Sequence, residues 1–379
     1  MKGHIRKRYK SSWSIVVDLG LKPDGKRNQV WKSIKGTKRE AEAELVRVLK
    51  ALEDGVYIES SKVTVSGYLD QWLKTIKCKV ASTTYERYEG VVNHSITPHI
   101  GGLKLNKLQP AHISNLYSEL LISGKHNSEG GLSKRSVLHV HRVLKTALTR
   151  AVKWQVLLRN PCDAVDPPKP DKKERQTFTA EETLDLLEKT QGNRLFLPIL
   201  LAVTTGMRRG EVLGLRWKDI DLDKKRLYVR QSIVSTKEHG IEIKPPKTGS
   251  SIRSIALPQT TIDGIRQYRS KQAELYLKLG IGLTPDSMLF DEYTGFNVPN
   301  SLTIAYAYFI KSHGFKHVTF HDLRHTHATH LLEKNINPKI VSERLGHSTI
   351  ALTMNTYSHV MPTMQEEAAN AIEQMLNRT

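Results

Sequence analysis

The feature that most constrains this chain of 379 residues is a segment that suits neither a helix interior nor a buried strand. "VDPPKPDKKER", Val165–Arg175, combines three prolines with alternating charge and no apolar periodicity. Proline removes a backbone donor, and this composition favours an extended, solvent-exposed connection. Since 39% of the residues are hydrophobic, the chain can build ordinary cores on both sides of it. We therefore predict separate domains, with residues 166–175 as a linker and residues 176–379 as one domain.

The N-terminal region, residues 1–60, has the pattern of a small sheet followed by a helix. "SWSIVVDLGL" and "NQVWKSI" are β-rich runs, and they flank "KPDGK", which has Pro and Gly where a turn needs them. Thr37 and Glu40 then have the spacing of a capping box, which predicts a helix that runs to about Leu52.

The charge of the chain is strongly positive and unevenly distributed. Residues 1–39 contain twelve Lys and Arg but two acidic residues, Asp18 and Asp24, an excess of ten out of the formal net charge of +20. A solvated basic tail would also account for this. An anionic polymer is the stronger interpretation, because each phosphate that is neutralised releases counterions and drives binding. We expect a nucleic-acid partner.

Residues 61–165 have a helical pattern, and the segment "KRSVLHVHRVLKTALTRAVKW", residues 134–154, is its most informative part. At about 100° per residue, the apolar side chains fall on one side of the helix and the cations within an arc of about 160° on the other. These cations are Lys134, Arg135, Arg142, Lys145, Arg150 and Lys153. A solvated face normally mixes signs, and this one has no acidic residue. We predict that the helix lies along DNA backbone.

Membrane, secretory and disulfide-rich classes do not fit the sequence. The longest apolar run near the centre, residues 195–203, is too short to cross a bilayer, and the basic N-terminus lacks the apolar segment of a signal peptide. The two cysteines, Cys78 and Cys162, are too few for a disulfide framework or a thiolate zinc cage. We expect a cytoplasmic protein with two ordinary buried or half-buried thiols.

The third region opens with a capping box at Thr179 and Glu182 and contains two separated cationic motifs. In "AVTTGMRRGEVLGLRWKDID", Arg208 and Glu211 are three residues apart on one face of a new helix, a spacing that by itself is usual for a surface ion pair. In "RLYVRQSIVSTKEHGIEIKPPKTGSSIRSIALP", three β-rich runs place Lys247 at the end of a hairpin. An exposed lysine there would ordinarily serve solubility alone.

A histidine cluster, "FHDLRHTHATHLL", raises the question of a metal site. Thr319 and Asp322 predict a helix start, so His321 lies in the first turn on one face with Arg324 and His325, whereas His327 and His330 point elsewhere. His321 and His325 have the spacing of a zinc pair, but a fixed cation stands between them. A cation and imidazole donors beside a helix N-terminus suit a phosphate instead. His325 remains a neighbour whose part is open, and the other two are expected to pack or to lie at the surface.

The last motif is "NINPKIVSERLGHSTIALTMNTYSHV". Asn337 caps a helix with Pro338 at its first position, and Gly346 ends it, which leaves His347 just beyond. Tyr357 follows ten residues later. Taken alone, the segment could be a helix-turn-helix DNA reader, and one tyrosine among thirteen could be structural.

Taken together and in this order, these motifs resemble the tyrosine recombinase family, also called phage integrases. "TGMRRGE" matches the first arginine motif, "PPKTGSSIRSIAL" the hairpin lysine, "HDLRHTHAT" the His-x-x-Arg motif, and "LGHSTIALTMNTYSH" the last histidine and the tyrosine. The rest of the chain resembles the lambda-like integrases of phages and conjugative transposons. The resemblance implies a mainly α fold with small β elements: an arm-type DNA-binding domain (1–60), a helical, SAM-like core-binding domain (61–165) and a mixed α/β, mostly α catalytic domain (176–379).

The resemblance also implies a role for each matching residue. Tyr357 would be the nucleophile, forming a 3′-phosphotyrosine, and Lys247 would protonate the leaving 5′-oxygen. Glu211 would support the first arginine. The side chains that would hold the phosphate are Arg208, Arg324, His321 and His347. Two guanidiniums that each make forked contacts replace a metal in this chemistry, so no cofactor is implied.

The implied partners are double-stranded DNA with core-type and arm-type sites, a homo-tetramer on that DNA, and an excisionase and a host DNA-bending protein. "PTMQEEAANAIEQMLNRT" would be an amphipathic tail helix that packs on a neighbouring protomer. Two alternatives stay open. A type IB topoisomerase uses a similar set of side chains, and a non-catalytic DNA-binding regulator would also be basic.

Overall fold

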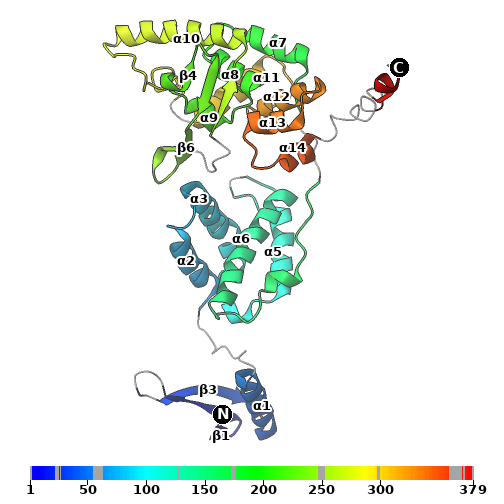
Figure 1. Cartoon of the computed structure of the whole chain (residues 1–379). Helices are drawn as coiled ribbons and strands as arrows, with labels where there is room; N and C mark the ends of the chain where they lie inside the picture. The colour runs from blue at the N-terminus through cyan, green and yellow to red at the C-terminus, as the bar shows by residue number, and fades with distance from the viewer. Residues whose placement is uncertain are drawn as a thin grey trace. The chain divides into compact units, whose positions relative to one another are not determined.

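The computed structural model describes residues 2–21, 25, 27–53, 63–126, 128–171, 176–245, 252–296, 299–357, 369 and 372–377. The chain forms two compact units, residues 1–172 and 173–379, and the boundary between them along the chain falls within the segment predicted to be a linker. Figure 1 shows the elements of each unit.

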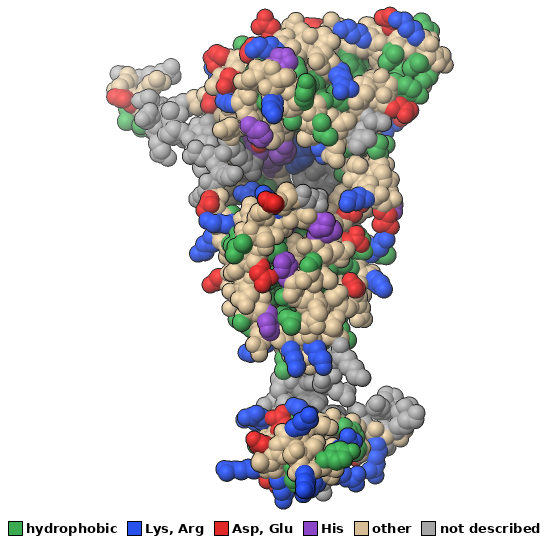
Figure 2. All heavy atoms as spheres, turned by 180° about the vertical axis from the view of Figure 1, so that it is seen from behind, with side chains coloured by type: hydrophobic (Ala, Val, Ile, Leu, Met, Phe, Trp, Pro, Cys, Tyr) green, Lys and Arg blue, Asp and Glu red, His purple; other side chains and the backbone are tan. Residues whose placement is uncertain are grey.

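The N-terminal part is an antiparallel sheet with one helix on it. Its elements are β1 (Lys2–Tyr9), β2 (Ser12–Leu21), β3 (Arg27–Lys35) and α1 (Lys38–Glu53). The strands follow the order β1-β2-β3, and Ile15 and Val17 of β2 pack with Val48 of α1. The predicted capping box is present, since the backbone N–H of Thr37 donates to the Glu40 carboxylate at 2.7 Å. Figure 2 shows Lys and Arg side chains gathered over this part of the chain.

The sequence prediction of two strands here was incomplete, because β1 is a third strand. Its sequence, "KGHIRKRY", offers the core little more than Ile5, which pairs with Ile15. A Cβ on Gly3 would lie 2.7 Å from Leu45, so α1 also packs closely over glycine on this strand. Basic residues alternate with these inward positions and hide the strand pattern.

A helical body follows in the same unit. Its longer helices are α2 (Val65–Ile76), α3 (Ser82–Val91), α5 (Pro110–Ser123) and α6 (Lys134–Lys153). The shorter ones are η1 (Val92–Ile96), α4 (Thr97–Ile100), η2 (Leu105–Lys107) and η3 (Pro161–Ala164). The core contains Trp72 and Tyr68, whose hydroxyl donates to the Ala147 carbonyl at 2.7 Å. The predicted apolar face of α6 is buried there, which confirms its orientation.

The second unit surrounds α8 (Phe196–Thr205), a helix whose sequence is apolar on nearly every side and is accordingly buried. The helices before the strands are α7 (Ala180–Lys189), α9 (Arg209–Leu213) and the turn η4 (Trp217–Asp219). The strands are β4 (Ile220–Asp221), β5 (Arg226–Val229), β6 (Ser232–Thr236), β7 (Gly240–Lys244) and β8 (Arg253–Ala256). They form an antiparallel sheet, β4-β5-β8, and a hairpin, β6-β7.

The remaining helices carry the last two motifs. They are α10 (Gln259–Lys278), α11 (Pro299–Ser312), α12 (Asp322–Glu333), α13 (Pro338–Leu345) and α14 (Ile350–Tyr357). Helix α12 packs on α8 and on α13, and α13 packs on α14 (Figure 1). The predicted caps are present: the Asn337 side chain accepts from the Lys339 N–H, and Gly346 has the left-handed backbone, φ +66°, that ends α13.

Other sequence predictions had different outcomes. Cys162 is buried as expected, but Cys78 is exposed, which corrects that part of the prediction. Several predictions lie outside the described residues: most of the turn "KPDGK", the boundary near residue 60, Lys247 and most of the predicted tail helix. Within the described part of the chain, no helix is both long and apolar enough to span a membrane.

Candidate active site

Side chains from four segments of the second unit meet at the point where α8 ends. Arg208 caps the start of α9, Arg324 lies on the first turn of α12, and the turn after α13 carries His347. Tyr357 is the last residue of α14. The packing of α8, α12, α13 and α14 therefore brings Arg208 together with motifs that lie more than a hundred residues later in the sequence.

The ion pair between Arg208 and Glu211 is present, and a second arginine binds the same carboxylate. Nη1 of Arg208 lies 2.7 Å from Oε1 of Glu211, whose other oxygen accepts from the Arg208 backbone N–H at 3.0 Å. That same oxygen also accepts from Nη2 of Arg253 at 2.8 Å. Glu211 is buried, whereas 39% of the Arg208 side chain is exposed. One carboxylate therefore orients two guanidiniums, of which only that of Arg208 has substantial access to solvent.

Arg324 is a buried cation with one unsatisfied nitrogen. Only 3% of it is exposed, and its Nη1 donates to the Gly206 carbonyl at 2.8 Å. Its Nη2 is buried and has no hydrogen-bond partner within the described part of the chain. Burial and the neighbouring Arg208 lower the pKa of Arg324 to about 9, with Glu211 acting in the opposite direction. A buried, charged donor without a hydrogen-bond partner destabilises the fold, and an anion that accepted its hydrogen bond would remove this destabilisation.

Gly206 makes the approach of α12 to α8 possible. Its φ is +67°, and a Cβ there would lie 2.6 Å from both His327 and Leu345. A side chain at this position would thus push α12 and α13 away from the carbonyl that holds Arg324.

His347 lies in the same cationic surroundings. Its Nδ1 lies 2.8 Å from Oγ1 of Thr353. Burial, followed by the charges of Arg324, Arg208 and Arg253, lowers the pKa of His347 to about 4. The imidazole is therefore neutral at pH 7, and it can donate one hydrogen bond without adding a charge.

Tyr357 is buried against His325, the histidine whose part the sequence left open. Only 2% of Tyr357 is exposed, and its Oη lies 2.5 Å from Nδ1 of His325. The ring of His321 is 5.4 Å from that of His325, edge to face, and His321 itself is exposed. The predicted shared face of His321, Arg324 and His325 is confirmed, although α12 is assigned from Asp322 and His321 immediately precedes it. The imidazole that contacts the phenol is that of His325.

The other two histidines pack away from this cluster, as predicted. Nδ1 of His327 lies 2.8 Å from the Val203 carbonyl, and its Nε2 accepts from Nε of Arg344 at 3.1 Å. His330 lies 3.2 Å from the Thr183 hydroxyl. Among the residues that the structure describes, no three His, Cys, Asp or Glu side chains could together hold a metal ion.

Sequence reasoning overlooked Arg253. The sequence contained a signal for it, because Arg253 lies two positions before Ile255 in the run that forms β8, and residues two apart in a strand face the same side. Ile255 is buried, so Arg253 points inward as well. A charge at such an inward position requires a buried partner, which is Glu211.

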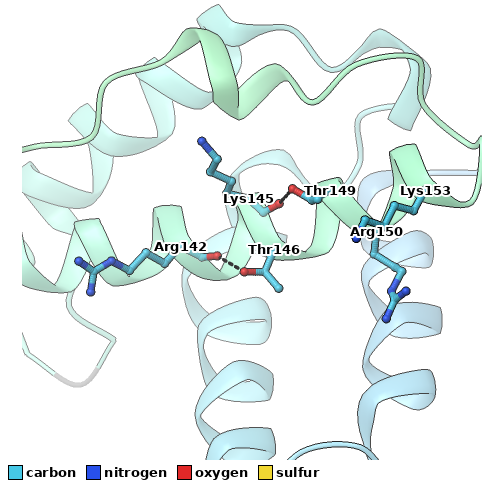
Figure 3. A pocket seen from close by; sticks show the side chains of 6 residues that line it. All are labelled: Arg142, Lys145, Thr146, Thr149, Arg150 and Lys153. Atoms are coloured by element: carbon cyan, nitrogen blue, oxygen red, sulfur yellow. Dashed lines mark hydrogen bonds between the residues drawn. The ribbon is translucent and has the colours of Figure 1, made fainter. Parts of the chain in front are cut away.

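A basic groove lies on α6 of the first unit. Its lining residues are Arg142, Lys145, Thr146, Thr149, Arg150 and Lys153. Figure 3 shows the cationic side chains pointing outward from one helix, while the two threonine hydroxyls donate to backbone carbonyls of α6 itself. All six predicted cations of this face are exposed.

As the sequence indicated, this face of α6 has no acidic residue of its own, but two aspartates from other segments contact it. Nζ of Lys134 lies 3.1 Å from Asp171, and Nζ of Lys145 lies 2.8 Å from Asp163. Both aspartates belong to segments that follow the helix, so the helical wheel could not reveal them. The pairs are solvent-exposed and therefore weak, which leaves the face positive.

Comparison with known proteins identifies the family. Residues 176–364 match the sequence model described as "Phage integrase family", and residues 64–121 match "Phage integrase, N-terminal SAM-like domain". The chain is 32% identical to a "Tyrosine recombinase XerC-like" protein of Caldanaerobacter subterraneus subsp. tengcongensis, over 98% of this chain and 97% of that one. The chain belongs to the tyrosine recombinase family. It is therefore a site-specific DNA recombinase of the integrase type, an enzyme that cuts and rejoins DNA.

Solved structures have the same fold. The Tn1549 transposon integrase, solved in complex with a circular intermediate DNA, has a TM-score of 0.69 at 20% identity and covers 83% of this tyrosine recombinase and 100% of its own chain. A lambda integrase tetramer bound to a Holliday junction has a TM-score of 0.56 at 20% identity, covering 91% of this chain and 95% of that one.

Proposed function

We propose that this recombinase integrates and excises a mobile DNA element, and that Tyr357 is its nucleophile. The observation that carries the proposal is the cluster of Arg208, Arg324, His347 and Tyr357, in which the buried Nη2 of Arg324 has no partner within the described residues. A phosphate oxygen is an acceptor that suits this donor in both charge and geometry.

In the proposed reaction, Oη of Tyr357 attacks the scissile phosphorus. The new Oη–P bond replaces the P–O5′ bond, so the products are a 3′-phosphotyrosine and a 5′-hydroxyl. Lys247 gives its proton to the leaving oxygen. A phenol is only about a thousandth ionised at pH 7, so its proton must also leave, and either His321 or His325 can accept it. Since bond energy is retained in the phosphotyrosine, a 5′-hydroxyl of another strand can reverse the step.

Negative charge grows on the non-bridging oxygens during this attack, and fixed donors aimed at those oxygens stabilise it. We assign this task to Arg208, Arg324, His321 and His347, with Glu211 orienting Arg208. Since Arg324 is 3% exposed and Tyr357 2%, DNA binding has to uncover them before phosphorus can come within reach of Oη.

We further propose the tasks of the other parts. The N-terminal domain, residues 1–60, binds arm-type sites, and the helical domain, residues 61–165, binds core-type sites through the basic face of α6. Residues 166–175 link these domains to the catalytic domain, residues 176–379. Four copies of the chain assemble on DNA. The lambda integrase tetramer bound to a Holliday junction supports this assembly by analogy. An excisionase and a host DNA-bending protein are further proposed partners, and the cytoplasm is the proposed compartment.

The test uses double-stranded attachment-site DNA with a nick close to the cleavage position, so that the short 5′ fragment diffuses away after attack. We expect an SDS-resistant protein–DNA adduct without added metal, and mass spectrometry should locate it at Tyr357. An equal yield of adduct from Tyr357→Phe would exclude the nucleophile assignment. No adduct from the unmodified protein would favour the DNA-binding regulator. Relaxation of supercoils without joining to a second DNA would favour a topoisomerase.

A further inference from the structure

Arg253 is a buried arginine of the second unit to which the proposed reaction assigns no task. Only 6% of its side chain is exposed, less than that of Arg208, its neighbour across Glu211. The contacts that hold a guanidinium at such a position matter, because an unpaired buried charge is strongly destabilising.

The first contact of Arg253 fixes the partner of Arg208. Nη2 of Arg253 donates to Oε2 of Glu211 at 2.8 Å, while Oε1 of Glu211 is 2.7 Å from Nη1 of Arg208. Burial alone would raise the pKa of Glu211, but the two arginines outweigh it, Arg253 first, and the pKa is lowered. Glu211 therefore remains an anion and holds Arg208 from one side while Arg253 holds Glu211 from the other.

The second contact of Arg253 reaches the turn that carries His347. Nε donates to the Arg344 carbonyl at 2.7 Å, in the last turn of α13. The Gly346 carbonyl accepts from Nη2 of Arg208 at 3.3 Å. Both arginines thus bind carbonyls at the C-terminal end of α13, where unsatisfied backbone oxygens carry partial negative charge. A Cβ on Gly346 would lie 3.0 Å from Nη1 of Arg253, so the guanidinium lies directly against this turn.

We propose that Arg253 is a positioning residue for DNA cleavage, one that locks the Arg208–Glu211 pair and the His347 turn into a single rigid clamp for the scissile phosphate. The inference rests on the proposed function, because it needs a phosphate between Arg208 and His347. Arg253 itself does not touch the phosphate. Its forked geometry joins two directions at once, towards Glu211 and towards Arg344, and a lysine cannot reproduce both.

A purely structural role is the alternative, and the second unit offers a matched control for it. Asp219, 1% exposed, is likewise held by two arginines: Nε of Arg216 at 2.9 Å and Nη1 of Arg230 at 3.5 Å. Arg216→Met and Arg253→Met therefore each remove one of two arginines from a buried carboxylate. The difference is that we assign Arg216, Asp219 and Arg230 no part in cleavage.

The experiment measures single-turnover adduct formation on the nicked attachment site with protein in excess, together with DNA affinity and thermal stability. A misplaced catalytic group can cost about 100-fold in rate. For Arg253→Lys we expect cleavage about tenfold slower or more, with full final yield of adduct and DNA affinity within about threefold of the unmodified protein. Arg253→Met should be slower still, and Arg216→Met should keep its rate within about threefold.

Rate and final yield separate the two explanations. A folding defect lowers the fraction of active protein, which appears as a lower final yield of adduct per protein when DNA is in excess, and it leaves the single-turnover rate unchanged. A positioning defect lowers the rate and leaves that yield per protein unchanged. If Arg253→Met does not fold, Arg253→Lys carries the test alone. An unchanged rate for Arg253→Lys, or a loss confined to yield, would overturn the proposal.

A double-mutant cycle gives the second readout. If Arg253 acts through the His347 turn, adding Arg253→Lys to His347→Ala should slow cleavage by a clearly smaller factor than it does in the unmodified protein. Equal factors in both backgrounds would contradict that path. Failure of the proposed function is distinct from both outcomes, because the unmodified protein would then form no Tyr357 adduct at all.

Discussion

The α6 face and the arginine cluster of the second unit are both positively charged, but they differ in burial and in what holds them. On α6, 51% of Lys134 and 46% of Lys145 are exposed, and each of these lysines forms a weak surface ion pair. In the cluster, 6% of Arg253 and 3% of Arg324 are exposed, and carboxylate and carbonyl oxygens fix their orientation. Exposed cations on long side chains suit non-specific attraction to a backbone, whereas buried and oriented ones suit the stabilisation of charge that develops during a reaction. Positive charge alone therefore does not reveal which part of this recombinase binds DNA and which part cleaves it.

The largest effect should come from the buried side of this comparison. Arg324→Lys removes the donor geometry around Nη2 while keeping a positive charge. Loss of one fixed donor of this kind typically costs a factor of about 100 to 1000 in rate. We expect single-turnover cleavage to fall by that factor while DNA affinity stays within about threefold. A variant that instead loses affinity and keeps its rate would show that Arg324 acts like the α6 cations.

The next effect concerns the histidine beside the phenol. His325→Asn removes the imidazole that lies 2.5 Å from Oη of Tyr357 and should slow cleavage by about 100-fold, a typical factor for a group that assists proton transfer. His321→Asn is the comparison variant, since His321 immediately precedes α12 and its ring contacts that of His325. The ratio of the two single-turnover rates identifies which imidazole the phenol depends on. An unchanged rate for His325→Asn would make its contact with Tyr357 a packing contact.

Burial should also make the second unit sensitive to acid. Burial and the charge of Arg344 lower the pKa of His327 to about 3, and Arg324 and His330 act in the same direction while the Val203 carbonyl opposes them. With a folded-state pKa below the ordinary value of about 6.5, His327 takes up a proton in the unfolded protein but not in the folded one, so stability falls as the pH drops below about 6.5. Between pH 7 and 5 the free energy of unfolding should fall by about 2 kcal/mol from this group.

Hydrogen exchange of peptides from α12, corrected for the intrinsic dependence of exchange on pH, measures this loss. In His327→Gln, the fall in protection between pH 7 and 5 should be smaller by about 2 kcal/mol than in the unmodified protein. The pKa of His347 is lowered as well, so part of the acid sensitivity should remain. Identical pH dependence in both proteins would mean that His327 is not held neutral.

The smallest effects should come from single changes on α6. Arg142→Gln should weaken DNA binding by up to about tenfold and flatten the dependence of log K on log salt by roughly 0.9, with site preference unchanged. Lys145→Gln should do less, because Asp163 already offsets part of its charge. Affinities measured by fluorescence anisotropy at several salt concentrations test both. If Lys145 proved the stronger contributor, its pair with Asp163 would have to open on DNA.

Local sequence patterns were sufficient where the physical cause is local. The capping boxes at Thr37, Thr179 and Thr319 all form, since a hydroxyl and a carboxylate three residues apart need only one helical turn to meet. The periodicity of α6 identified its buried face for the same reason. Local patterns failed where an element interacts with a distant part of the chain. Strand β1 was missed because a strand with one clearly apolar residue depends on pairing with its neighbouring strand. The ion pairs of α6 were missed because Asp171 and Asp163 belong to later segments.

The sequence by itself determined the residue types, their order and their helical faces, and so the family and the set of side chains proposed for the phosphate. Tertiary structure alone decided how those side chains are coupled. It placed His325, not His321, against Tyr357, left Nη2 of Arg324 without a partner in the described residues, and brought Arg253 to Glu211 and to the end of α13. The reason is physical: spacing along one helix fixes direction, but which groups meet across α8, α9, α12, α13 and β8 depends on how closely those elements pack, and glycines at positions 206 and 346 set that distance.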